Sequence, residues 1–210
     1  VISARSQDSP VKQPSAGLHF FYNDFITPRR ISSTSLGDVL KNGDWNRPGN
    51  MEGGFGLDYL QGLTRHIDLI GTFNGSWVDY LLPSGSLYGS SNFLLDINAG
   101  AHLKLLSDNH IFSPFLITKA GFTSYKGISG FSLTPGAGLQ ISLFKEAFVL
   151  TNIEYRAALG NSISNQLFYS VGIVTGIGKK KSVPVRKEAA PLPEPVKKEP
   201  VFSARDISVI

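Results

Sequence analysis

The sequence predicts an all-β fold: an eight-stranded antiparallel up-and-down transmembrane β-barrel followed by an extended linker. Between residues 16 and 178, apolar and polar residues alternate with the period of two that is typical of strands. Short and long connections alternate between these segments. The 210 residues include 22 Gly and 14 Phe, and only 17% are charged, against a typical ~25% in globular proteins. This composition favours strands over helices.

Eight alternating segments are bounded by turn residues. The fourth is the clearest, because Phe93, Leu95 and Ile97 fall on one face while Asp96 and Lys104 fall on the other. The expected strands cover residues 16–25, 51–60, 66–80, 91–105, 111–125, 131–144, 147–158 and 166–178.

The lengths of the connections predict how the barrel sits in a membrane. Short turns are expected after the second, fourth and sixth strands, and longer loops after the others, the longest at residues 26–50. In bacterial outer membranes the short turns face the periplasm and the long loops face the outside. An even number of strands returns both chain ends to one side, so we expect both termini in the periplasm of a Gram-negative bacterium.

The polar face of the strands is expected to line the lumen. It combines glycines with charged residues, as in Gly54, Gly56 and Asp58, whereas the surface of a soluble barrel is normally rich in Lys, Glu and Thr. A narrow lumen needs small residues and a few paired charges. Aromatic residues near the strand ends predict two lipid-interface girdles. The loop-end girdle is expected from Phe20, Tyr22, Phe25, Trp77, Tyr80, Phe122, Tyr125, Phe168 and Tyr169, and the turn-end girdle from Tyr59, Phe112, Phe144 and Phe148.

The inward-facing charges are the main candidate site. We expect Asp68 to lie nearly opposite Lys104, and Asp96 to lie diagonal to Lys119. Unpaired charges in a dry lumen are costly, so salt bridges are expected. Because eight strands leave just enough room for their own side chains, we interpret the network as a plug; a proton or ion path is the alternative. The full predicted network is Asp58, Asp68, Asp96, Lys104, Lys119, Glu154 and Arg156.

Other kinds of site have little support in the sequence. There is no Cys, and the four histidines (His19, His66, His102 and His110) lack metal-binding spacing, so no metal, cofactor or catalytic residue is assigned. An enzyme acting on lipids would need His, Ser and Asp to converge at the loop rim. Pro114 and Pro135 each remove a ladder hydrogen bond and indicate either a bulge or a lipid-side gap.

The two ends of the chain differ from the barrel in composition. Residues 1–15 form a polar segment without the apolar core of a signal peptide. Residues 179–205 are expected to be a periplasmic linker rich in Lys and Pro, and residues 206–210 the start of a further domain. The whole net charge of +4 falls within residues 179–200, which argues against a nucleic-acid surface on the barrel.

Eight strands with short turns, followed by KKKSVPVRKEAAPLPEPVKKEP, resemble the N-terminal barrel and linker of outer membrane protein A-type proteins, in a form similar to those of Bacteroidota. The resemblance implies a non-enzymatic anchor in outer-membrane lipid that holds a peptidoglycan-binding domain. The alternative is an accessory subunit of a barrel-assembly, secretion or nutrient-import complex. In that case other outer-membrane proteins would dock on the long first loop, through Trp45, Arg47, Pro48 and Met51.

Limited proteolysis of native membranes tests the predicted linker. Five prolines and ten charged residues between positions 179 and 200 leave no apolar face for packing, so cleavage is expected there first. A protected fragment of about residues 16–178 should remain, measured by intact mass. Cleavage within that fragment while the linker stays intact would contradict both the boundary and the topology.

Overall fold

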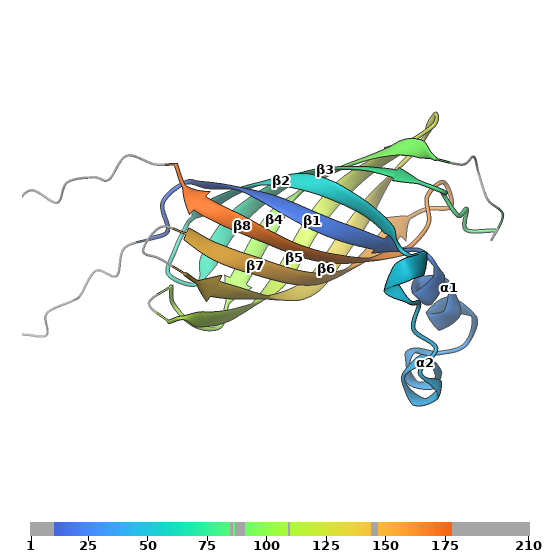
Figure 1. Ribbon diagram of the computed structural model, residues 1–210, viewed down its shortest axis with the longest axis horizontal. Coiled ribbons are helices and arrows are strands. Elements are labelled where there is room, and N and C mark those ends of the chain that lie inside the picture. The colour runs from blue at the N-terminus through green and yellow to red at the C-terminus, as the bar shows by residue number, and fades with distance from the viewer. Residues whose placement is uncertain (1–10, 85, 87–90, 109, 144–146, 178–210) are drawn as a thin grey trace, which may run out of the picture. The chain divides into compact units, whose positions relative to one another are not determined.

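Eight antiparallel strands close into a barrel in the computed structural model, which describes residues 11–84, 86, 91–108, 110–143 and 147–177 (Figure 1). Each strand pairs with the next, and β8 pairs with β1, as the sequence predicts. The expected linker at 179–205, the segment at 206–210 and residues 1–10 lie outside the described residues. The strands are β1 (Ser15–Asp24), β2 (Glu52–Gly62), β3 (Ile67–Val78), β4 (Asn92–Lys104), β5 (Phe112–Tyr125), β6 (Ile128–Ser142), β7 (Ala147–Leu159) and β8 (Gln166–Gly176).

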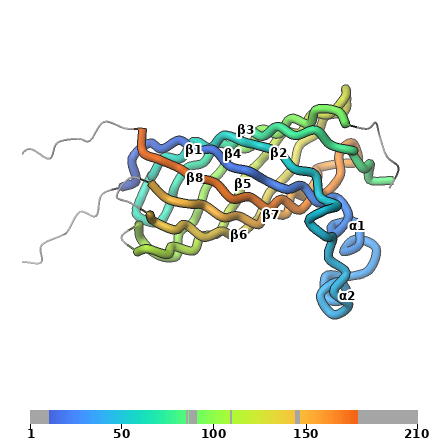
Figure 2. Tube along the Cα trace, in the orientation of Figure 1, coloured from blue at the N-terminus to red at the C-terminus, as the bar shows by residue number. Residues whose placement is uncertain are grey.

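The first residue of β1 and the last residue of β8 meet at one end of the barrel. Ser15 is in register with Gly176, and the Ile177 amide donates a hydrogen bond to the Pro14 carbonyl at 2.9 Å. The connections after β2, β4 and β6 lie at this same end, here called the turn end, and the remaining connections lie at the opposite loop end (Figure 2).

The β5–β6 connection differs from the prediction of a longer loop. It is a two-residue turn formed by Lys126 and Gly127, which have φ values of 44° and 83°. Positive φ at both turn positions matches the twist of a tight hairpin, and Gly adopts it without strain. Strand β6 therefore begins at Ile128, three residues earlier than expected.

The long connection at residues 26–50 contains short helices where the sequence predicts only a loop. They are α1 (Ile26–Ser33), α2 (Leu36–Asn42) and the 3₁₀ turn η1 (Pro48–Asn50). The Ser35 side chain caps α2 by accepting from the Asp38 amide, and Gly43 ends it in the left-handed conformation. No helix in the described part of the chain is long and apolar enough to cross a membrane.

The two faces of the barrel wall have opposite character. Between the first and last residue of each strand, the outward positions hold no charged side chain, and every strand is among the described residues. Large apolar side chains cover the outside instead, including Leu18, Phe55, Leu57, Leu69, Phe73, Ile97, Leu116, Leu133, Ile153, Val171 and Ile173.

Several aromatic residues expected in the girdles point inward instead. Phe168 and Tyr125 occupy inward positions of β8 and β5, and Phe25 and Tyr80 are buried just beyond the ends of β1 and β3. Phe148 is buried inside the turn end. In a strand one residue of register decides the face, and beyond a strand's end the alternation no longer applies, so the girdle prediction was wrong for these five. Outward aromatic side chains include Tyr22, Trp77 and Phe93 toward the loop end and Tyr59 and Phe112 toward the turn end, while Phe144 lies outside the described residues.

The two strand prolines face outward and create no bulge. Pro114 pairs with Leu139 in the β5–β6 ladder. The β6–β7 ladder is interrupted beside Pro135, and the same register resumes on the other side of the interruption. Because proline has no N–H group, it removes the ladder bond without inserting a residue.

A glycine substitution tests the close approach of β4 and β5. A Cβ at inward-facing Gly100 would meet the backbone of Thr118 and Lys119, so Gly100→Ala should lower the free energy of unfolding by about 1–3 kcal/mol. Gly71 on neighbouring β3 is the matched control, since a Cβ there meets nothing within 4 Å. Gly71→Ala should change stability by less than about 0.5 kcal/mol in urea titrations from lipid vesicles. Equal effects of the two variants would contradict the close approach.

Candidate functional site: the lumen of the barrel

The lumen is filled by layers of side chains of different chemistry. The inward-facing residues of β5 pass through these layers in order from the turn end to the loop end. They are Ser113, Phe115, Ile117, Lys119, Gly121, Thr123 and Tyr125. Polar, apolar, charged and aromatic side chains thus follow one another along a single strand. Each of the layers below is assembled from several strands.

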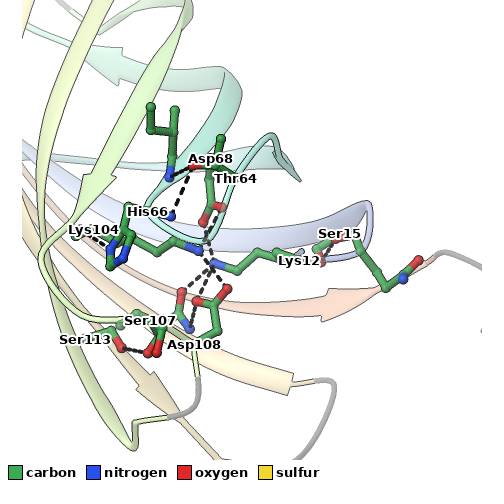
Figure 3. Close-up of polar contacts among 12 residues, drawn as sticks. Lys12, Ser15, Thr64, His66, Asp68, Lys104, Ser107, Asp108 and Ser113 are labelled. Atoms are coloured by element: carbon green, nitrogen blue, oxygen red, sulfur yellow. Dashed lines mark hydrogen bonds and ion pairs between the residues drawn. The ribbon is translucent and has the colours of Figure 1, made fainter. Parts of the chain in front are cut away.

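The turn-end layer is a cluster of four charged side chains (Figure 3). Lys104 Nζ lies 2.9 Å from Asp68 Oδ1 and 2.6 Å from Asp108 Oδ2. Lys12 Nζ lies 2.7 Å from Asp68 Oδ2 and 3.5 Å from Asp108 Oδ1, and it donates to Gln140 Oε1 at 2.5 Å. Two cations and two carboxylates therefore alternate across the mouth, and the expected proximity of Asp68 and Lys104 is observed.

Lys12 comes from the segment before β1 and was not among the expected site residues. Its ammonium lies 4.5 Å from the centre of the Phe148 ring, and the Gly62 amide donates to its backbone carbonyl at 3.2 Å. The segment before β1 therefore closes the turn end of the lumen. The sequence signal was weak, because a single Lys in a polar, proline-flanked stretch normally faces solvent.

An apolar layer adjoins the charged mouth. It consists of Leu60, Ile70, Phe115, Ile117, Phe148, Leu150 and Val174. The His102 ring stacks on Phe115 with a centroid distance of 4.3 Å. This layer separates the turn-end cluster from the charges deeper in the lumen.

The mid-lumen charges pair across the barrel. Lys119 Nζ lies 2.7 Å from Glu154 Oε1, and Arg156 Nη1 lies 2.9 Å from Asp96 Oδ2. All four side chains are almost fully buried. The expected pairing of Asp96 with Lys119 is therefore wrong, because each side chain reaches a strand beyond its immediate neighbour. Thr123 donates to the other oxygen of Asp96, and the Arg156 guanidinium stacks 3.7 Å from the centre of the Phe168 ring.

Asp58, the remaining residue of the predicted network, contacts a histidine rather than a lysine or arginine. His19 Nδ1 lies 2.7 Å from Asp58 Oδ2, and His19 Nε2 lies 2.8 Å from Asn74 Oδ1. The three side chains come from β1, β2 and β3 and are all buried. His19 stands in strict alternation between apolar residues, which is the only signal by which the sequence could have assigned it to the lumen.

A cluster of apolar and aromatic side chains closes the loop end: Phe25, Val78, Tyr80, Leu94, Tyr125 and Ile163. The Tyr80 and Tyr125 rings stack with a centroid distance of 4.9 Å, and the Tyr125 hydroxyl donates to the Val78 carbonyl at 3.0 Å. Burial raises the pKa of Tyr80 to about 12, so its hydroxyl stays protonated at physiological pH.

Asp24 and Asn46 fix the long first loop to the barrel rim. Asp24 Oδ1 accepts from the amides of Ile26 and Thr27 and from Asn46 Nδ2, at 2.9, 3.1 and 3.1 Å. Of the predicted docking residues, Arg47 and Pro48 are exposed, Trp45 is 39% exposed and Met51 is half-buried. The loop therefore presents these side chains on a rim that is itself well anchored.

The described residues contain no group of three or more potential metal ligands from His, Asp and Glu. The buried acids are instead engaged by the cations and polar groups described above. Within the described chain the lumen is thus built from mutually compensating charges.

No protein family and no curated protein matches this chain, but solved structures do. The N-terminal β-barrel domain of Pseudomonas aeruginosa OprF is 10% identical, with a TM-score of 0.50 and coverage of 79% of this chain and 98% of that domain. Neisserial surface protein A is 9% identical, with a TM-score of 0.50 and coverage of 80% and 99%. At these identities the likeness establishes the fold alone, a closed eight-stranded antiparallel barrel.

A double-mutant cycle tests the pairing of Lys119 with Glu154. Lys119→Met leaves a fully buried carboxylate without its cation, so it should cost about 3–5 kcal/mol of stability. Lys119→Met combined with Glu154→Leu should recover much of that loss. Urea unfolding from lipid vesicles gives the comparison.

Lys104→Met is the matched control for this cycle. It should cost less than Lys119→Met, because Lys12 still contacts both Asp68 and Asp108. A double variant no more stable than Lys119→Met alone would show that the two residues are not coupled.

Proposed function

We propose that this protein is a non-enzymatic outer-membrane barrel that anchors a periplasmic segment at the cell envelope. The observation that carries the proposal is the distribution of charge: strand interiors bear no charge on the outside, while the charged side chains face the lumen and pair there. Hydrocarbon excludes charges and requires every backbone polar group to be bonded, and a closed barrel with an apolar exterior meets both conditions.

The proposed orientation places the turn end in the periplasm. Short connections lie on that side in outer-membrane barrels. Strand β8 ends there at Gly176, so the Lys- and Pro-rich sequence from residue 179 onward follows from the periplasmic end. Anchoring to peptidoglycan through a further domain is the role that this arrangement suits.

The filling of the lumen favours an anchor over a pore. Charged pairs, an apolar layer and an aromatic cap follow one another along the barrel, and their side chains are buried. Such a lumen acts as a plug that stiffens the wall.

A second candidate function is an accessory subunit of a larger outer-membrane complex, and the long first loop favours it. Helix α2 exposes Leu36 and Leu40, which are 50% and 59% accessible and lie on one face at i, i+4 spacing. Trp45, in the same loop, is also exposed, and partner proteins often cover exposed apolar side chains of this kind.

Gentle detergent extraction followed by mass spectrometry separates the two candidates. For an anchor, the protein should be extracted from the outer-membrane fraction without a stoichiometric protein partner. Recovery of a stoichiometric complex would favour the subunit, and recovery from another cell fraction would overturn both.

Substitutions in α2 sharpen the comparison. If a complex is found, Leu36→Ser with Leu40→Ser should release the partner, whereas Lys41→Gln on the same helix should not. Leu36, Leu40 and Lys41 are all exposed, so neither variant should alter the folding of the barrel.

A further inference from the structure

A cavity of about 300 Å³ lies at the loop end, outside the charged lumen. Three separate segments line it: residues 25–32 in and just before helix α1, residues 81–83, and residues 158–165. Its lining is mixed, and the large apolar side chains in it are Phe25, Leu81, Leu82 and Ile163, two of which belong to the cluster that closes the loop end.

The walls of the cavity are held in place by hydrogen bonds that do not depend on a ligand. The Ser164 amide donates to the Tyr80 hydroxyl at 2.9 Å, and the Ser164 hydroxyl donates to the Leu81 carbonyl. On the opposite side Asp24 caps the first turn of α1. A pre-formed cavity binds a ligand without the cost of ordering its own loops.

Helix α1 and its N-cap residue present one apolar and two polar side chains to this cavity. Phe25, Arg29 and Ser32 all line it, and their i, i+4, i+7 spacing places them on one face of the helix. Phe25 is buried, whereas Arg29 is exposed. The cavity therefore brings a buried apolar side chain and an exposed cation together in one lining.

Arg29 is the charged residue of the lining, and none of the lining residues is acidic. In the described part of the chain, the Arg29 side chain makes no hydrogen bond or ion pair, whereas the side chain of its neighbour Arg30 donates to the Asp44 carbonyl at 2.6 Å. A guanidinium offers five donors in a planar fork that suits the oxygens of a carboxylate or phosphate. The Asn161 and Asn165 side chains add polar groups to the same lining.

We propose that this cavity binds an amphiphile in which an oxyanion, phosphate or carboxylate, is attached to an apolar body. The oxyanion is bound by Arg29, and the apolar body packs on Phe25, Leu81, Leu82 and Ile163. Two sources share this chemistry: the headgroup and upper chain of an outer-leaflet lipid, and a soluble amphiphilic anion from outside the cell.

Isothermal titration of the full chain, delipidated in a neutral maltoside detergent, tests the proposal with hexyl phosphate as the probe. Hexyl phosphate should bind more tightly than inorganic phosphate, which lacks the apolar body. Arg29→Gln should weaken hexyl phosphate binding by about tenfold or more, because a charge-assisted hydrogen bond is lost.

Two further variants control the experiment. Arg30→Gln removes an equal charge from the same helix outside the cavity and should bind like the wild type. Asn161→Trp places a large ring at an exposed position of the lining and should abolish binding while the barrel still shows its folded mobility on unboiled gels. Absence of binding by the wild type, or equal binding by wild type and Arg29→Gln, would overturn the proposal.

Repeating the titration in bilayer discs distinguishes the two sources. If an outer-leaflet lipid is the natural occupant, discs containing phosphatidylglycerol should suppress hexyl phosphate binding relative to discs of phosphatidylcholine alone. Equal binding in both discs assigns the site to a soluble amphiphile. Either result, with Arg29 dependence retained, supports the oxyanion site.

Discussion

Closure of the sheet between β8 and β1 is the constraint on which the other features depend. Their ladder runs from Ser15 and Gly176 to Asp24 and Leu167, and it leaves no strand edge unpaired. An open edge would expose a row of N–H and C=O groups that hydrocarbon cannot satisfy. Closure also divides the side chains into an outward apolar set and an inward polar set, so every charge carried by the strand interiors must be accommodated in a narrow lumen.

That lumen explains why the charges form pairs and layers. Removing an ion from water costs several kcal/mol unless a partner is close, and eight strands leave little room for water. Two ion pairs meet this requirement across the barrel: Lys119 with Glu154, and Arg156 with Asp96. At the turn end it is met by the cluster of Lys12, Asp68, Lys104 and Asp108. The turn end is closed by a segment from outside the sheet, whose Lys12 gives the turn-end acids a second cation.

At the loop end the lumen is closed by apolar and aromatic side chains rather than by ion pairs. Aromatic side chains from β5 and from the segments just after β1 and β3 close the lumen, and the loops are fixed at this end by Tyr80, Asp24 and Asn46. A rigid rim allows surface loops to present specific groups, as α2 presents Leu36 and Leu40 and α1 presents Arg29. The structure thereby separates a barrel wall, which serves stability, from a rim on which recognition can develop.

The sequence by itself determined the fold and the two faces of the wall. Strict alternation of apolar and polar residues specifies strands, and it assigns residues such as Asp96, Lys119 and Glu154 to one face whichever strands become neighbours. Only the tertiary structure decided their partners, since Asp96 on β4 meets Arg156 on β7 across the lumen rather than Lys119 on adjacent β5. The alternation likewise could not predict that Lys12, Phe25 and Tyr80 point into the lumen. These residues lie outside the strands, where periodicity no longer determines the direction of a side chain and packing alone sets its position.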